Sequence, residues 1–205
     1  MAGKLKMKKI AIFSAIVTLL SFGYKLVLAI LTTSNVLIVA ATSTLLLFFC
    51  KLLFIKNVTM TRDKKKKAYL FMAILILLYS IIFLLFTVLK AFGIDTSNQK
   101  SYEGIVGSLL IGFMIVMFIL SIIKLKGALE KTDIMVIGLK EMVFVTALAD
   151  LVIIEEYLYR TFFIDKGIEP LDIGTQYFPL AMGVLMLIVA TFMFIRFARY
   201  QVEKK

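Results

Sequence analysis

The chain has 205 residues, of which 61% are hydrophobic and 18% charged, and it carries a formal net charge of +11 at pH 7. Soluble domains average about 45–50% apolar and about 25% charged residues, so this composition excludes an ordinary soluble domain and a disordered chain. The lack of histidine and the single cysteine, Cys50, exclude an internal disulfide, a Ser-His-Asp triad and a histidine-bearing zinc site. We therefore expect no catalytic residues, no metal site and no cofactor.

Six apolar stretches are each long enough, as a helix of about 20 residues, to cross a hydrocarbon core of about 30 Å. In chain order they are Ile10–Leu31, Val36–Ile55, Ala68–Leu89, Gly104–Ile123, Ile134–Leu158 and Gly174–Ile195. Because lipid cannot pair with backbone N–H and C=O groups, each stretch is expected to be helical. The sequence therefore predicts an all-α, polytopic integral membrane protein, a six-transmembrane-helix bundle in which residues 1–205 form a single domain.

Basic residues are distributed unequally between the two sides of these predicted spans. Seventeen lysines and arginines lie near the termini or in the second and fourth connections, against four in the remaining connections. Because basic loops stay inside, both termini are expected to be cytoplasmic. Anionic lipid is the expected partner of one basic run, made up of Lys64, Lys65, Lys66 and Lys67. The basic residues are spread over four membrane-edge segments, which excludes nucleic acid as a partner.

The first predicted span carries a polar stripe. Its members follow one another at steps of four, three and four residues, which places them on one helical face: Ser14, Thr18, Ser21 and Lys25. Two interpretations stay open. Small hydroxyl residues pack helices closely together, or the stripe forms a polar path that ends at Lys25. The polar run Thr42–Thr44 in the second span is expected to pack against it.

The fifth predicted span supplies acidic residues. Asp150 and Lys25 lie at similar depths when counted from the outer ends of their spans. An ionised side chain is costly within lipid, so we expect an ion pair or hydrogen bond between them, with Glu155 as the second candidate acid. The pair either fixes helix register or binds a proton or substrate. Glu155 and Glu156 lie near the outer end and are either buried or interfacial.

The fourth predicted span begins with small residues four apart, Gly104, Ser108 and Gly112. Such spacing lets two helices approach closely, and it predicts a helix contact.

The segment Gly23–Ser34 resembles the end of the first helix in cation diffusion facilitator transporters, with its lysine, small residue and Thr-x-Ser turn. The resemblance implies a bundle in which helices one, two, four and five enclose a site, with helices three and six beside them. Where that family places metal ligands, this chain has Ala40, Ser43 and Leu47, and then Met142, Val145 and Ala149. The resemblance therefore implies a bundle that lacks the metal site.

Two further segments show a resemblance. The segment Gly138–Leu158 is similar to uncharacterised six-span proteins of Gram-positive bacteria, which implies a bacterial plasma membrane. Glu155–Arg160 has the form E-E-x-x-x-R and resembles the first motif of CAAX-type intramembrane proteases. Later motifs of that family supply histidine, which this chain lacks, so the resemblance implies at most a degenerate, non-catalytic relative.

Two functions follow from these patterns. The first is a non-enzymatic membrane protein that acts through a membrane partner or through self-assembly as a homo-oligomer. The alternative is a small transporter or permease that uses a group made up of Ser21, Lys25, Asp150 and Glu155. A transporter predicts a polar cavity lined by the first three of these residues, whereas a partner-binding protein predicts a dry interior and an outward seam of small residues.

Overall fold

The computed structural model describes residues 2–32, 35–57, 59–92, 105–129, 133–162 and 172–202. Within them the regular secondary structure consists of helices, which confirms the all-α prediction. The helices are α1 (Ala2–Thr32), α2 (Asn35–Asn57), α3 (Arg62–Ala91), α4 (Ile105–Leu129), α5 (Ile134–Phe162) and α6 (Asp172–Val202). Several extend beyond the predicted spans because flanking lysine, arginine and alanine residues are good helix formers.

Four of these helices, α1, α2, α3 and α6, contain segments that are long and apolar enough to cross a membrane. Many of their large apolar side chains point out of the bundle, among them Phe13, Leu20 and Ile82. Exposure of such side chains to water is unfavourable, while their exposure to lipid is not. The chain therefore contains transmembrane helices, and a membrane crossing by α4 and α5 stays a prediction.

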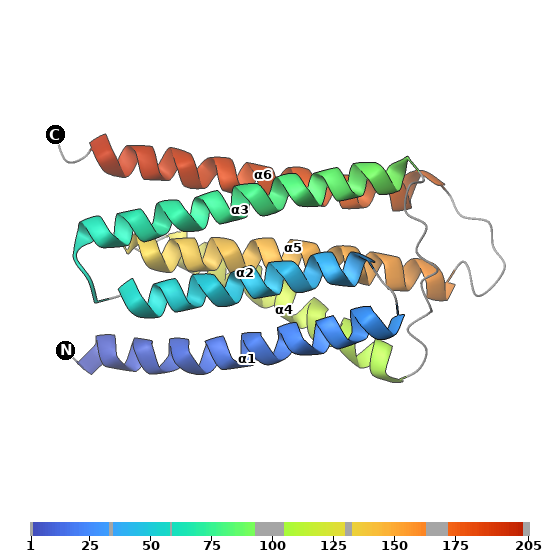
Figure 1. Cartoon of the computed structure of the whole chain (residues 1–205), viewed down its shortest axis with the longest axis horizontal. Helices are drawn as coiled ribbons and strands as arrows, with labels where there is room; N and C mark the ends of the chain where they lie inside the picture. The colour runs from blue at the N-terminus through green and yellow to red at the C-terminus, as the bar shows by residue number, and fades with distance from the viewer. Residues whose placement is uncertain are drawn as a thin grey trace.

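The helices run side by side along the long axis of the molecule (Figure 1). Helix α5 is central, with its backbone close to those of α2, α3, α4 and α6. Helix α3 packs along α6 on one side, and α1 packs along α2 on the other. Among the described helices, the backbone of α1 approaches only α2, and that of α4 approaches only α5. The start of α1 and the end of α6 lie at the same end of the bundle (Figure 1).

Small residues allow the central contacts. A Cβ atom added to Gly138 of α5 would lie 2.7 Å from the ring of Tyr69 on α3. A Cβ atom added to Gly183 of α6 would lie 2.6 Å from the side chain of Leu84 on α3. Both distances are far below van der Waals contact, so these two glycines let α5 and α6 lie close against α3.

The start of α5 is held by one acidic residue. Asp133 accepts a hydrogen bond from the backbone N–H of Met135 at 3.0 Å, as a helix N-cap does. Its second carboxylate oxygen forms an ion pair with Nζ of Lys65 on α3 at 2.6 Å. The beginnings of α3 and α5 are thereby joined.

The small residues at the start of the fourth predicted span are only partly described by the structure. Gly104 and the side chain of Ser108 lie outside the described residues, whereas Gly112 is exposed on α4.

A candidate binding site between helices α1, α2, α4 and α5

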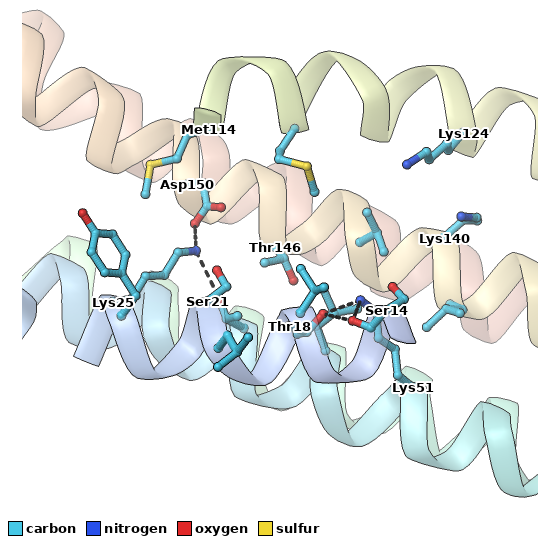
Figure 2. A pocket seen from close by; sticks show the side chains of 18 residues that line it. Ser14, Thr18, Ser21, Lys25, Lys51, Met114, Lys124, Lys140, Thr146 and Asp150 are labelled. Carbon is cyan, nitrogen blue, oxygen red and sulfur yellow. Dashed lines mark hydrogen bonds and ion pairs between the residues drawn. The ribbon is translucent and has the colours of Figure 1, made fainter. Parts of the chain in front are cut away.

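A cavity of about 610 Å³ lies between four helices, α1, α2, α4 and α5 (Figure 2). Its polar wall consists of Ser14, Thr18, Ser21, Lys25, Thr44, Lys51, Lys124, Lys140, Thr146 and Asp150. Along α1 the wall extends over twelve residues, from Ser14 to Lys25, or ~16 Å at the helical rise. A volume of this size is typical of sites for small molecules, which range from about 300 to about 1,000 Å³.

The ion pair expected between Lys25 and Asp150 is present at one end of this cavity. Nζ of Lys25 lies 2.5 Å from a carboxylate oxygen of Asp150 and donates a second hydrogen bond to the Thr44 hydroxyl at 3.0 Å. The Thr44 hydroxyl in turn donates to the carbonyl oxygen of Ala40 at 3.1 Å. Both charged residues are buried, at 4% and 8% exposure. The contact joins α1, α2 and α5 through their side chains.

A second lysine, Lys51 of α2, meets the polar stripe of α1. Its Nζ donates to the carbonyl oxygen of Ser14 at 3.0 Å and to the hydroxyl of Thr18. The Thr18 hydroxyl donates to the same carbonyl at 2.8 Å. Lys51 was not among the predicted site residues. A signal was available, because Thr44, Leu47 and Lys51 follow at steps of three and four and share one helical face.

Two further lysines line the same end of the cavity as Lys51. Lys124 comes from α4 and Lys140 from α5 (Figure 2). The positive charges of both side chains repel the ammonium group of Lys51. The described wall of the cavity contains four lysines and one acidic residue, Asp150, so it has a surplus of three positive charges. The basic end and the Lys25–Asp150 end are connected by the polar stripe of α1.

The remaining wall is apolar and reaches the outside of the bundle between α1 and α4. It includes Leu20 and Tyr24 of α1 and Met117 of α4, each of them an exposed side chain. Because the backbones of α1 and α4 do not approach each other, side chains alone bound the cavity there.

The polar run of the second span is only partly directed to the stripe. Thr44 contacts Lys25, as expected, but the exposed Thr42 donates to its own helix, at the carbonyl oxygen of Ile38. Ser43 is fully buried and donates to the carbonyl oxygen of Ala40. The difference follows from helical geometry, since consecutive residues point ~100° apart.

A second polar cluster lies on another face of α5. The carboxylate of Glu141 pairs with the guanidinium of Arg196 on α6 and accepts a hydrogen bond from the Tyr69 hydroxyl at 3.1 Å. Lys140 precedes Glu141 in the sequence and lines the cavity, so the two neighbouring residues lie on different faces of α5. This cluster was not predicted from the sequence, because Arg196 falls in a basic terminal segment whose charge is already explained by the membrane topology.

The other predicted site residues occupy distinct places. Ser21 lines the cavity. Glu155 is half-buried and is not part of the cavity wall, while Glu156 is buried. The side chain of Arg160, the last residue of the E-E-x-x-x-R motif, lies outside the described residues. Within the described part of the chain, no group of three or more histidine, cysteine or acidic residues is placed to hold a metal ion.

Comparison with models of known protein families, with curated proteins and with solved structures finds no match to this chain. The cavity is lined by the first, second, fourth and fifth helices, while α3 and α6 pack together beside them. The resemblance to cation diffusion facilitators stays a prediction.

Proposed function

We propose that the protein is a small membrane transporter whose ligand site is the cavity between α1, α2, α4 and α5. One observation supports this over the other candidates: Ser21, Lys25 and Asp150 lie together on the polar wall of a cavity of about 610 Å³. A cavity with polar residues on its wall is what the transporter interpretation requires and what a dry, partner-binding bundle would lack. The proposal includes six membrane crossings, cytoplasmic termini and a bacterial plasma membrane.

In this orientation the two ends of the cavity have different roles. Lys51, Lys124 and Lys140 each lie five or six residues from a helix end on the cytoplasmic side, which is ~7–9 Å. The Lys25–Asp150 pair lies toward the opposite side, at the other end of the cavity. In the proposed transporter the cavity is reached from the cytoplasm, and this ion pair with Thr44 is its seal toward the outside.

Transport requires that this seal opens. Helix α1 is the suitable moving element, because its backbone approaches only α2 among the described helices. Separating Lys25 from Asp150 leaves two charges without partners, which is costly away from water. A ligand that offers a charged group to Lys25 or to Asp150 reduces that cost. Ligand binding and opening of the seal are therefore coupled through exchange of ion-pair partners.

The experiment tests from which faces the cavity can be reached. Cys50 is replaced by alanine, and Ser21→Cys is introduced as the reporter. Right-side-out cells and inside-out vesicles are treated with a charged, membrane-impermeant methanethiosulfonate. Ile82→Cys is the matched control, because Ile82 is exposed on the apolar surface of α3 and should meet lipid. We expect Ser21→Cys to be labelled from both faces, faster from the cytoplasmic face, and the control from neither.

Labelling of Ser21→Cys from one face alone would overturn transport, and labelling from neither face would show a dry interior. The latter is the result expected by a second candidate function, self-assembly or partner binding. One observation favours that candidate: α4 approaches only α5 among the described helices, and a Cβ atom on Gly112 would meet nothing within 4 Å. This surface of α4 is open for another helix.

A further inference from the structure

A groove of about 410 Å³ lies between α2 and α3 and shares no lining residue with the cavity described above. We infer that this groove binds an anionic phospholipid, with one acyl chain along the groove and the headgroup at Lys56. The inference goes beyond the proposed function and does not need it. Helices α2 and α3 are both among the four that are long and apolar enough to cross a membrane.

The lining of the groove is apolar except at one end. Its apolar residues come from both helices: Leu46, Phe49, Leu52, Leu53, Phe71 and Leu75. Phe49, Leu52 and Phe71 are exposed side chains, so the groove lies on the outside of the bundle. The remaining lining residue is Lys56, which is also exposed. An apolar groove that ends at one cation matches a molecule with an apolar chain and an anionic head.

The length of the groove matches one leaflet of the membrane. Leu46 lies at the middle of α2, and Lys56 lies in the last turn of that helix. The ten residues from one to the other rise ~15 Å along the helix, which is half of a hydrocarbon core of about 30 Å. A lipid acyl chain extends over one leaflet, whereas a transmembrane helix of a partner would need contacts across the full thickness. In the proposed orientation this leaflet is the cytoplasmic one.

Basic residues around the end of the groove make the headgroup anionic rather than neutral. Residues 56–67 contain six basic side chains and one acidic side chain. Three of the six are directed to other helices. Lys65 pairs with Asp133 at the start of α5. Arg62 and Lys66 each lie over an aromatic ring of α6. The other three are exposed: Lys56, Lys64 and Lys67.

These three lysines have different roles in the proposed site. Lys56 lines the groove and meets the headgroup directly. Lys67 lies four residues before Phe71, and Lys64 lies three residues before Lys67, so both share the α3 face that lines the groove. They act through the electrostatic potential at the membrane surface and do not need to touch the lipid. Each basic residue near an anionic surface adds a factor of about five in affinity.

The chain contains no tryptophan, so a single introduced tryptophan reports on the lipid beside it. Phe71→Trp places this reporter in the groove, and Phe192→Trp on α6 is the matched control. Both are exposed phenylalanines nine or ten residues from a helix end on the same side, and Phe192 does not line the groove. The full-length variants are reconstituted in vesicles of phosphatidylcholine and phosphatidylglycerol, in which one lipid or the other is brominated and quenches tryptophan on contact.

We expect phosphatidylglycerol to be preferred over phosphatidylcholine about five-fold or more at Phe71→Trp, with almost no preference at Phe192→Trp. Adding Lys56→Gln to the groove reporter should lower the preference several-fold, while adding Lys126→Gln should leave it unchanged. Lys126 is the matched lysine, because it too is exposed and lies in the last turn of its helix. If Phe71→Trp does not fold, Phe49→Trp replaces it, since Phe49 is an exposed lining residue of the same groove.

Equal quenching by the two lipids in the groove, or the same preference at both reporters, would overturn the inference. A preference that Lys56→Gln leaves unchanged, or that Lys126→Gln lowers as much, would also overturn it. Quenching of the groove reporter by neither lipid would mean that another protein segment covers the groove, such as a second copy of the chain. None of these outcomes bears on transport, which the labelling of Ser21→Cys tests at a separate place in the molecule.

Discussion

At the scale of single residues, each charged side chain near the cavity has a physical reason for its place. Lys25 and Asp150 could be paired from the sequence because each is too costly to leave alone in an apolar segment, and because they lie at matching depths. Lys51 could not be assigned in the same way. Its acceptors are a backbone carbonyl and a hydroxyl of α1, and no depth argument singles out such common groups.

Replacing Asp150 by asparagine should lower stability by about 3–5 kcal/mol, because Lys25 stays buried without an opposite charge. Thermal unfolding in detergent, followed by circular dichroism, measures the loss. The double variant Lys25→Met/Asp150→Leu should recover most of it, since no buried charge is then left alone.

Lys67→Gln is the control for this change. It removes one charge from an exposed position and should stay within about 0.5 kcal/mol of the unmodified protein. An unchanged melting temperature for Asp150→Asn would mean that the ion pair contributes nothing to the fold.

At the scale of helices, hydropathy located the apolar part of each element but not its ends. The structure continues α1 back to Ala2 and α6 on to Val202, through lysine- and arginine-rich segments that remain helical. A span is limited by the thickness of lipid, whereas a helix ends where its backbone hydrogen bonding stops. The close approach of α3 to α5 at Gly138 had no sequence signal of its own, because many glycines occur in membrane helices.

Gly138→Ala tests that approach. The added methyl group would lie 2.7 Å from the ring of Tyr69, which is fully buried and donates to Glu141. Overpacking of this kind costs about 1–3 kcal/mol, so the melting temperature should fall.

Gly127→Ala on α4 is the matched control, because its added methyl group meets nothing within 4 Å. The control should be neutral or more stable by up to about 1 kcal/mol, as alanine favours a helix over glycine. Equal effects in both variants would contradict close packing at Gly138.

At the scale of the whole molecule, the arrangement of helices creates two separate polar regions around α5. One is the basic cavity beside α1, α2 and α4, and the other is the Glu141 cluster toward α3 and α6. Lys140 and Glu141 are neighbours in sequence and yet belong to different regions. A count of charges along the chain cannot separate them, because the separation depends on how α5 is rotated within the bundle.

The orientation of the bundle has its own test. The start of α1 and the end of α6 lie at one end of the molecule, together with the connection between α2 and α3 (Figure 1). Because this end carries most of the basic residues, we expect it to be cytoplasmic. Fusions of green fluorescent protein to either terminus should be fluorescent in bacteria, and fusions of alkaline phosphatase should be inactive. An active phosphatase fusion at either terminus would reverse the proposed orientation of the cavity.

The sequence by itself determined that the chain is helical, that it contains transmembrane segments, and that Lys25 and Asp150 need partners. These properties depend on the transfer of single side chains and backbone groups out of water, which each residue brings with it. Tertiary structure alone decided that Lys51, Lys124 and Lys140 share one cavity and that Glu141 turns away from it. Those contacts depend on how each helix is rotated and how far apart the helices lie. Packing between helices determines both, and the sequence of one segment alone does not.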